Sequence, residues 1–92
     1  MAMDRRDRIE AHLRIVFAPA TLEVTDDSAR HAGHAGAREG GQTHYRVQIV
    51  SARFAGLNRV ARHRLVFDAL KGEFADGLHA LNIEALAPDA PA

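Results

Sequence analysis

The hydrophobic residues of this chain recur with two different periods, one typical of helices and one typical of strands. Within residues 4–18, the large apolar residues fall at helical spacing and form a single stripe, which predicts an amphipathic helix. Residues 22–26 and 43–51 instead alternate apolar and polar side chains, as a strand with one buried face does. The residues expected to point inward from the longer strand are Tyr45, Val47 and Ile49.

The second half of the chain predicts a further helix and a third strand. Residues 59–75 carry apolar rows at helical spacing, Asn58 is a suitable N-cap, and a short helix is expected near residues 57–61. Residues 78–86 form the last predicted strand, whose inward face begins with His79. The order helix, strand, strand, optional short helix, helix, strand predicts an α+β fold of two layers, a three-stranded sheet with helices on one face.

Length and composition limit the class of protein. A chain of 92 residues with 47% hydrophobic residues is expected to form one domain, here residues 1–86, followed by a flexible tail at residues 87–92. It contains no cysteine, which excludes a disulfide framework, a CxxC redox site and a thiolate zinc site. The charged start has no signal-peptide pattern and no apolar run is long enough to span a membrane. We therefore expect a cytoplasmic protein without a membrane partner.

The charges balance, with twelve basic and twelve acidic residues, but they are unevenly placed. Residues 45–67 contain five arginines and no acid, which indicates either an ordinary solvated face or a basic binding surface. The sequence contains no pairing of a nucleophile with a base and no nucleophile-elbow motif around a serine. It also contains no phosphate-binding loop of the Walker or dinucleotide type. These observations argue against an enzyme.

Six histidines are the most promising chemical groups in the sequence. His79 is either a packed histidine bonded to a backbone carbonyl or a neutral imidazole ligand at the rim of the core. His31 and His34 lie in residues 28–42, a predicted loop with four glycines and no hydrophobic residue larger than alanine. Their HxxH spacing is a weak zinc signal without other ligands. His44 alternates with the inward residues of its strand and is expected on the sheet surface.

Taken in order, several short segments resemble the BolA family over residues 5–86. They are LEV (22–24), DS (27–28), THYRV (43–47), VS (50–51), RFAG (53–56), RHRLVF (62–67), AL (69–70) and LHAL (78–81). The resemblance implies a KH-like fold of the second type, which agrees with the predicted order of elements. It also implies pairing with a monothiol glutaredoxin, with which BolA-like proteins share a glutathione-bound [2Fe-2S] cluster for iron–sulfur trafficking or iron and redox regulation.

The same resemblance suggests which residues bind this cluster. His79 matches the C-terminal ligand histidine of the family, and the second ligand would come from the loop, where His31 and His34 are both candidates. Since the chain has no cysteine, sulfur must come from glutaredoxin and glutathione, so the isolated chain is expected to hold no cluster. Plain zinc or copper binding by the three histidines is a further alternative.

A different class of function is a DNA-binding transcriptional regulator of stress response and cell morphology. It would use the KH-like fold and the acid-free basic segment at residues 46–64. The neutral net charge and the missing GxxG clamp argue against it. The residues that could contact phosphates, glutathione carboxylates or a partner protein are Arg53, Arg59, Arg62 and Arg64.

Overall fold

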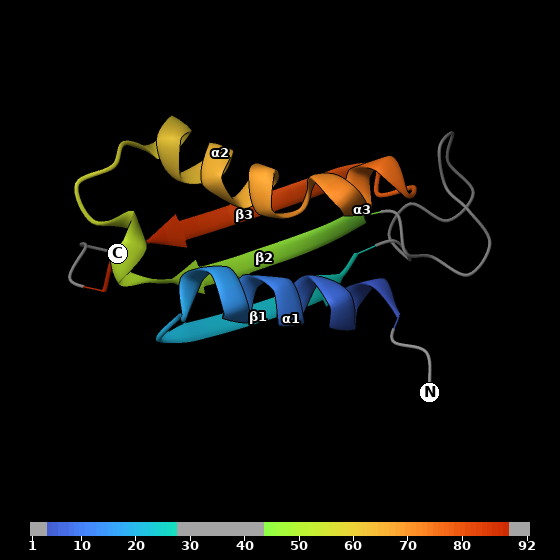
Figure 1. Ribbon diagram of the computed structural model, residues 1–92, viewed down its shortest axis with the longest axis horizontal. Helices are drawn as coiled ribbons and strands as arrows, with labels where there is room; N and C mark the ends of the chain where they lie inside the picture. Colours follow the sequence, from blue (N-terminus) through green and yellow to red (C-terminus); the bar gives the residue numbers. More distant parts are fainter. Residues whose placement is uncertain (1–3, 28–43, 89–92) are drawn as a thin grey trace.

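The computed structural model describes residues 4–27 and 44–88, and these contain one mixed sheet of three strands (Figure 1). The strands are β1 (Thr21–Asp26), β2 (His44–Val50) and β3 (Ala80–Leu86). They lie in the order β1-β2-β3, with β1 antiparallel and β3 parallel to β2. The parallel pair brings the first residues of β2 and β3 to the same end of the sheet.

Helices α1 (Arg5–Phe17), α2 (Arg59–Ala69) and α3 (Lys71–Ala75) form the second layer of the fold (Figure 1). Asp4 and Asn58 are the N-caps of α1 and α2, and each side chain accepts a hydrogen bond from the backbone amide three residues on. Within the described part of the chain, no helix is long and apolar enough to cross a membrane. The predicted α+β fold with three strands and helices on one face is confirmed.

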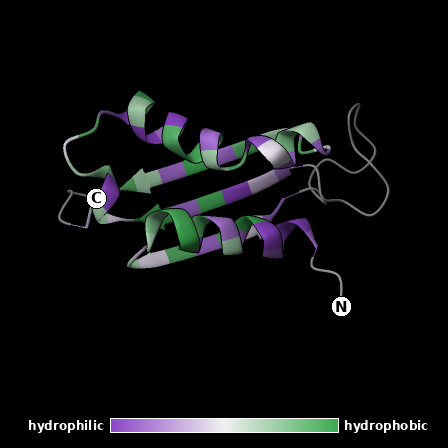
Figure 2. Cartoon of the chain, in the orientation of Figure 1, coloured by the Kyte–Doolittle hydropathy of each residue, from purple (hydrophilic) through white to green (hydrophobic). Residues whose placement is uncertain are grey.

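The core lies between the helices and the sheet. Along β2 the buried residues are the three inward residues expected from the alternating pattern, and α1 contributes a stripe spaced four residues apart. Hydrophilic and hydrophobic residues follow one another along β2 in Figure 2. The buried hydrophobic residues are Ile9, Leu13, Phe17, Val24, Tyr45, Val47, Ile49, Phe54, Val66, Leu70, Leu78, Ile83 and Ala85. Most of the helical and strand residues in this set follow from the hydrophobic periodicity alone.

The prediction of one continuous helix over residues 59–75 is wrong, because the helix breaks at Leu70. This residue leaves the helical conformation, with φ −109° and ψ 10°, and its side chain is 1% exposed. Gly72 follows directly and weakens helix propagation. The break redirects the short α3 so that it packs beside α1. The carboxylate of Glu73 on α3 accepts hydrogen bonds from Arg5 and Arg8 on α1.

The short helix expected near residues 57–61 is instead a 3-10 turn, η2 (Ala52–Phe54). The hydroxyl of Ser51 explains its position, because it donates to the carbonyl of Phe17 at 2.7 Å and accepts from the amide of Arg53. Phe54 at the end of the turn is buried against the ring of Phe17, with 5.0 Å between ring centroids. Tertiary packing therefore fixes a turn that carries no periodic signal in the sequence.

Candidate functional site

Two histidines at the starts of neighbouring strands lie close together at one end of the sheet. His44 is the first residue of β2, and His79 immediately precedes β3, where Ala80 pairs with His44 in the parallel ladder. Their ring centroids are 6.1 Å apart and the ring planes are inclined by 50°. His79 is exposed and His44 is half-buried. The parallel register thus brings together two imidazoles that are 35 residues apart in sequence.

The expectation that His79 points inward at the rim of the core is wrong. Gly77 adopts φ 119°, and the amide of Leu78 donates to the carbonyl of Glu73 at 2.9 Å, which closes the end of α3. This turn sends Leu78 into the core, where it is 3% exposed. His79 lies before the first paired residue of β3, so strand alternation does not govern its side chain and the imidazole remains accessible.

The other two histidines proposed as ligands, His31 and His34, lie outside the described residues. Within residues 4–27 and 44–88, no group of three or more histidine, aspartate or glutamate side chains could hold a metal ion. His44 and His79 therefore offer two nitrogen donors and would need further ligands from elsewhere. The proximity of His44 was missed because alternation places it on the sheet surface but says nothing about which strand lies beside it.

A partly buried network of ion pairs supports the segment that leads to His79. Arg5 is only 6% exposed, and its guanidinium donates to the carboxylates of Glu73 at 3.0 Å and Asp76 at 3.1 Å. It also donates to the carbonyl of Asp76 at 2.8 Å. Arg8 contacts the same Glu73 carboxylate at 3.0 Å. The hydrogen bonds from Arg8 and Arg5 lower the pKa of Glu73 against the opposing effect of its burial.

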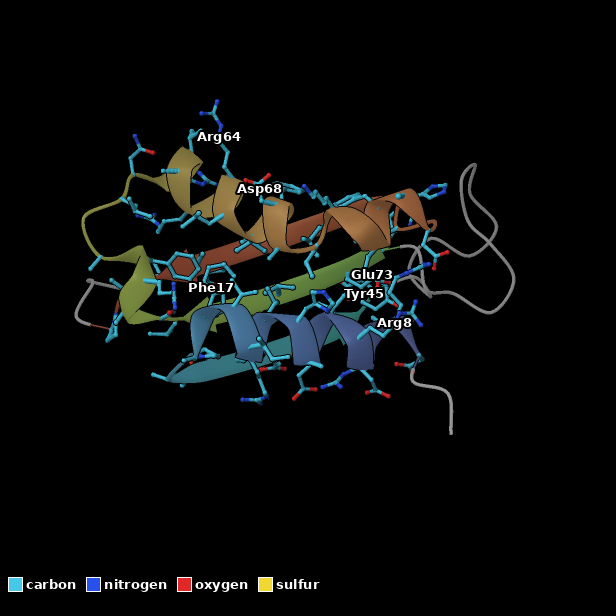
Figure 3. All side chains as sticks on the ribbon, in the orientation of Figure 1. Arg8, Phe17, Tyr45, Arg64, Asp68 and Glu73 are labelled. Atoms are coloured by element: carbon cyan, nitrogen blue, oxygen red, sulfur yellow. The ribbon has the colours of Figure 1, made fainter. Side chains whose placement is uncertain are left out.

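This network links α1 to α3 close to the start of β2 (Figure 3). The Tyr45 side chain lies in the same region, and it is 2% exposed. Among the described residues, its hydroxyl has no hydrogen-bond partner. Burial raises the pKa of Tyr45 to about 12, and the charge of Asp26 acts in the same direction. Tyr45 is therefore a neutral phenol on the buried face of β2, next to His44 in sequence.

A second candidate region is the outer face of α2, where Arg59 and Arg64 are exposed. Arg62 is half-buried, and its guanidinium donates to the carbonyl of Leu57 at 2.7 Å. A shallow hollow on this face has apolar and cationic walls. It is lined by Arg59, Val60, His63, Arg64 and Phe67.

Nearby positive charges and an exposed apolar side chain characterise this α2 face. Burial lowers the pKa of His63, and the positive charges of Arg59 and Arg62 lower it further. Val60 is 57% exposed, so the hollow presents an apolar side chain to solvent between the arginines. Arg53 lies in a different hollow, between α1 and α2, so the four proposed arginines do not form one cluster.

Comparison with known proteins identifies the family. The family described as BolA-like protein matches residues 13–90. The chain belongs to the BolA family. A solved structure of BolA1 from Arabidopsis thaliana is similar, with a TM-score of 0.85 and 40% identity, covering 99% of this chain and 100% of that one. BolA membership places the chain in a non-enzymatic family of regulatory or partner proteins.

Two relatives cover most of this BolA chain. An uncharacterized protein in the cobS 5′ region of Sinorhizobium sp. is 48% identical over 90 residues, 97% of either chain. The DNA-binding transcriptional regulator BolA of Escherichia coli is 42% identical over 76 residues, which are 83% of this chain and 69% of the relative. The similarity therefore extends over both the histidine end and the α2 face.

Proposed function

We propose that this BolA-family protein binds a monothiol glutaredoxin and contributes imidazole ligands to a glutathione-bound [2Fe-2S] cluster held between the two proteins. The observation that carries the proposal is the exposed His79 beside His44 at one end of the sheet. The resemblance to BolA proteins implies the partner and the cluster, and it also implies that His79 is the C-terminal ligand histidine.

The donor groups fit such a shared cluster. A [2Fe-2S] cluster takes four protein or thiol ligands, and histidine can replace cysteine on one of its irons. The chain has imidazoles but no cysteine, so its share is limited to nitrogen ligands and the sulfur ligands belong to glutaredoxin and glutathione. When bound, a cluster with imidazole ligands supplies electron-transfer chemistry at a higher potential than an all-thiolate one.

The surrounding residues of the chain prepare His79 for this role. The ion pairs of Arg5 with Glu73 and Asp76 hold the end of α3, and the turn at Gly77 then directs the imidazole to solvent. A ligand held in place before binding loses less conformational freedom when the partner arrives. The role is therefore to present a positioned ligand to a partner, for cluster transfer or for iron and redox sensing.

Co-expression tests the proposal. The protein and a monothiol glutaredoxin, purified together with glutathione, are expected to show the visible absorption and electron paramagnetic resonance of a [2Fe-2S] cluster. His79→Ala should change both spectra or abolish the cluster, whereas His12→Ala, an exposed histidine on α1, should leave them unchanged. A wild-type complex without a cluster, or a His79→Ala complex with the wild-type spectra, contradicts the proposal.

A second candidate function is DNA binding through the α2 face. The specific observation in its favour is that Arg59 and Arg64 are exposed and line the same hollow on α2, in a chain similar to the E. coli transcriptional regulator. Fluorescence anisotropy with duplex DNA tests it. A dissociation constant tighter than about 10 µM at physiological salt, weakened by Arg59→Ala and Arg64→Ala but not by His79→Ala, supports DNA binding. Weaker binding for the wild type removes this candidate.

A further inference from the structure

Strand β3 lies at one side of the sheet, and its outer edge has no partner strand. The carbonyl of Leu86 accepts a hydrogen bond from the amide of Ser51, which follows β2, at 3.0 Å. Backbone directions alternate along a strand, so the amides and carbonyls of Leu81, Ile83 and Ala85 face away from β2. Within the part of the chain that the structure describes, no other group bonds to them. β3 thus offers a row of N–H and C=O groups to a further strand.

The opposite edge of the sheet, on β1, is covered by a charged side chain. The amide of Asp27 donates to the carbonyl of His44 at 2.8 Å, so by alternation the carbonyl of Val24 faces away from β2. The guanidinium of Arg6 on α1 donates to this carbonyl at 2.9 Å. Charged side chains protect sheet edges in this way, because an unpaired edge recruits another strand. Among the described residues, β3 has no equivalent cover.

The outer face of α2 lies alongside the free edge of β3. Helix α1 packs against β1 and α2 packs against β3 (Figure 1). Leu65 and Ala69 line the hollow between the two helices, so the hollow with Val60 and Phe67 lies on the side of α2 away from α1.

Side chains on this outer side are exposed. Arg64 projects from α2 away from α1 in Figure 3. Val60 is 57% and Phe67 39% exposed. An apolar hollow beside an unpaired edge can receive alternate side chains of an added strand.

The charges on the outer face of α2 indicate which kind of strand fits. The acid of this helix, Asp68, lines the hollow toward α1, whereas Arg59 and Arg64 line the outer hollow. A second copy of the chain would bring its own arginines against these, because a two-fold interface presents the same patch from both sides. Such like charges oppose pairing, whereas carboxylates complement the face. The observations therefore favour an acidic partner over a second copy.

We propose that an extended acidic segment of a partner protein adds as a fourth strand to the free edge of β3. The outward backbone groups of β3 supply the main-chain hydrogen bonds, and the hollow at Val60 and Phe67 receives alternate apolar side chains. Arg59 and Arg64 pair with the carboxylates of the segment. This docking mode requires neither a cluster nor glutaredoxin, so it goes beyond the proposed function and does not depend on it.

Titration of the ¹⁵N-labelled protein with a synthetic peptide tests the docking. The probe is a capped peptide as long as β3, seven residues, with aspartate at both ends and threonine alternating with valine between them. The amide signals of Leu81, Ile83 and Ala85 should shift in nuclear magnetic resonance spectra. Their hydrogen exchange should slow by about tenfold or more, because the added strand protects them. The amides of β1 should not respond.

Modified peptides separate strand addition from other kinds of contact. Two peptides, each N-methylated at one of the two alternating sets of amides, keep the same side chains and charge. Only one set can face β3, so one peptide should bind about tenfold or more weakly and the other should bind as the parent does. A peptide with lysine in place of aspartate should bind about tenfold or more weakly.

Protein variants test the charged part of the surface. Arg59→Ala/Arg64→Ala should weaken the aspartate peptide by about tenfold. Arg14→Ala, which removes an exposed arginine on α1, is the matched control and should leave the affinity unchanged. All of these side chains are exposed, so the variants are expected to fold.

Several results would overturn the proposal. It is wrong if the aspartate peptide does not bind at millimolar concentration, or if the two methylated peptides bind equally. It is also wrong if concentrating the protein alone shifts the same amides of β3, since the edge would then pair with a second copy. Signals of α2 that shift with duplex DNA but not with the peptide would assign this face to nucleic acid instead.

Discussion

The histidine end of the sheet and the outer face of α2 both carry side chains that could bind a partner, but they are built differently. At the histidine end, His79 follows a segment fixed by Arg5, which is 6% exposed and bonded to two carboxylates. On the α2 face, Arg59 and Arg64 project from one helix into solvent. One region is organised by buried contacts between distant parts of the chain, and the other by a single helix.

This difference indicates what each region can do. A metal ligand must be held within a fraction of an ångström, which requires supporting contacts around it. Exposed arginines on a helix can attract anions and orient a partner, yet they discriminate little because their side chains move freely. The histidine end is therefore suited to coordination and the α2 face to docking.

The largest effect is expected from Arg5, because its removal would break the network that supports His79. Arg5→Ala leaves the 14%-exposed carboxylate of Glu73 with Arg8 as its main partner and should lower the free energy of unfolding by about 3 kcal/mol. Arg14→Ala, which removes an exposed pair with Glu10 on α1, should cost less than about 0.5 kcal/mol. Urea unfolding curves measure both.

Equal losses for the two variants would show that the network contributes no more than a surface ion pair. The histidine end would then be no more firmly held than the α2 face. Nuclear magnetic resonance spectra of Arg5→Ala add a local test, since the signals of His79 should shift while those of Arg59 and Arg64 should not.

A smaller effect is expected from Tyr45, the only tyrosine of a chain that has no tryptophan. Its phenolate absorbance should appear around the pKa of about 12. Since the folded pKa lies above the unfolded value of about 10, the folded state keeps a proton that the unfolded chain releases, and stability should fall as the pH rises above about 10. Tyr45→Phe should remove this pH dependence.

At neutral pH the same variant should be neutral or stabilising by up to about 1 kcal/mol, because it deletes a buried hydroxyl without a partner among the described residues. Thermal and urea unfolding of the Tyr45→Phe protein measure this difference. A clear loss of stability would mean that the hydroxyl makes a hydrogen bond in solution, most simply to a bound water.

The smallest effect on stability is expected on the α2 face. Arg59→Ala/Arg64→Ala should change the free energy of unfolding by no more than about 0.5 kcal/mol, since both side chains are exposed. The double variant should also leave the cluster spectra of the glutaredoxin complex unchanged while weakening any binding to anionic partners. Spectra altered in the manner of His79→Ala would show that the two regions form one site.

The sequence predicts much of the fold because its signals are periodic. The alternation around Tyr45 and the helical stripe of α1 required only local patterns, and the structure confirms both. The break at Leu70 depends on what α3 packs against, and the 3-10 turn depends on a bond between Ser51 and the carbonyl of Phe17. Hydrophobic periodicity predicts neither of these contacts.

The candidate site was predicted only in part. His79 was identified through the resemblance to a family, but its neighbour His44 follows from the parallel pairing of β2 with β3, which no local pattern specifies. The burial of Arg5 was also missed, because an arginine in the first turn of a helix is normally solvated. Local sequence patterns predict neither the pairing of distant strands nor the burial of a charged side chain.

The central claim is that nitrogen atoms of this chain bind the cluster. The most direct measurement uses the protein with ¹⁵N-labelled histidine, unlabelled glutaredoxin and pulsed electron paramagnetic resonance of the reduced cluster. We predict strong coupling to at least one ¹⁵N nucleus, and this coupling should be absent in His79→Ala. A reduced cluster without any strongly coupled ¹⁵N nucleus would contradict the account.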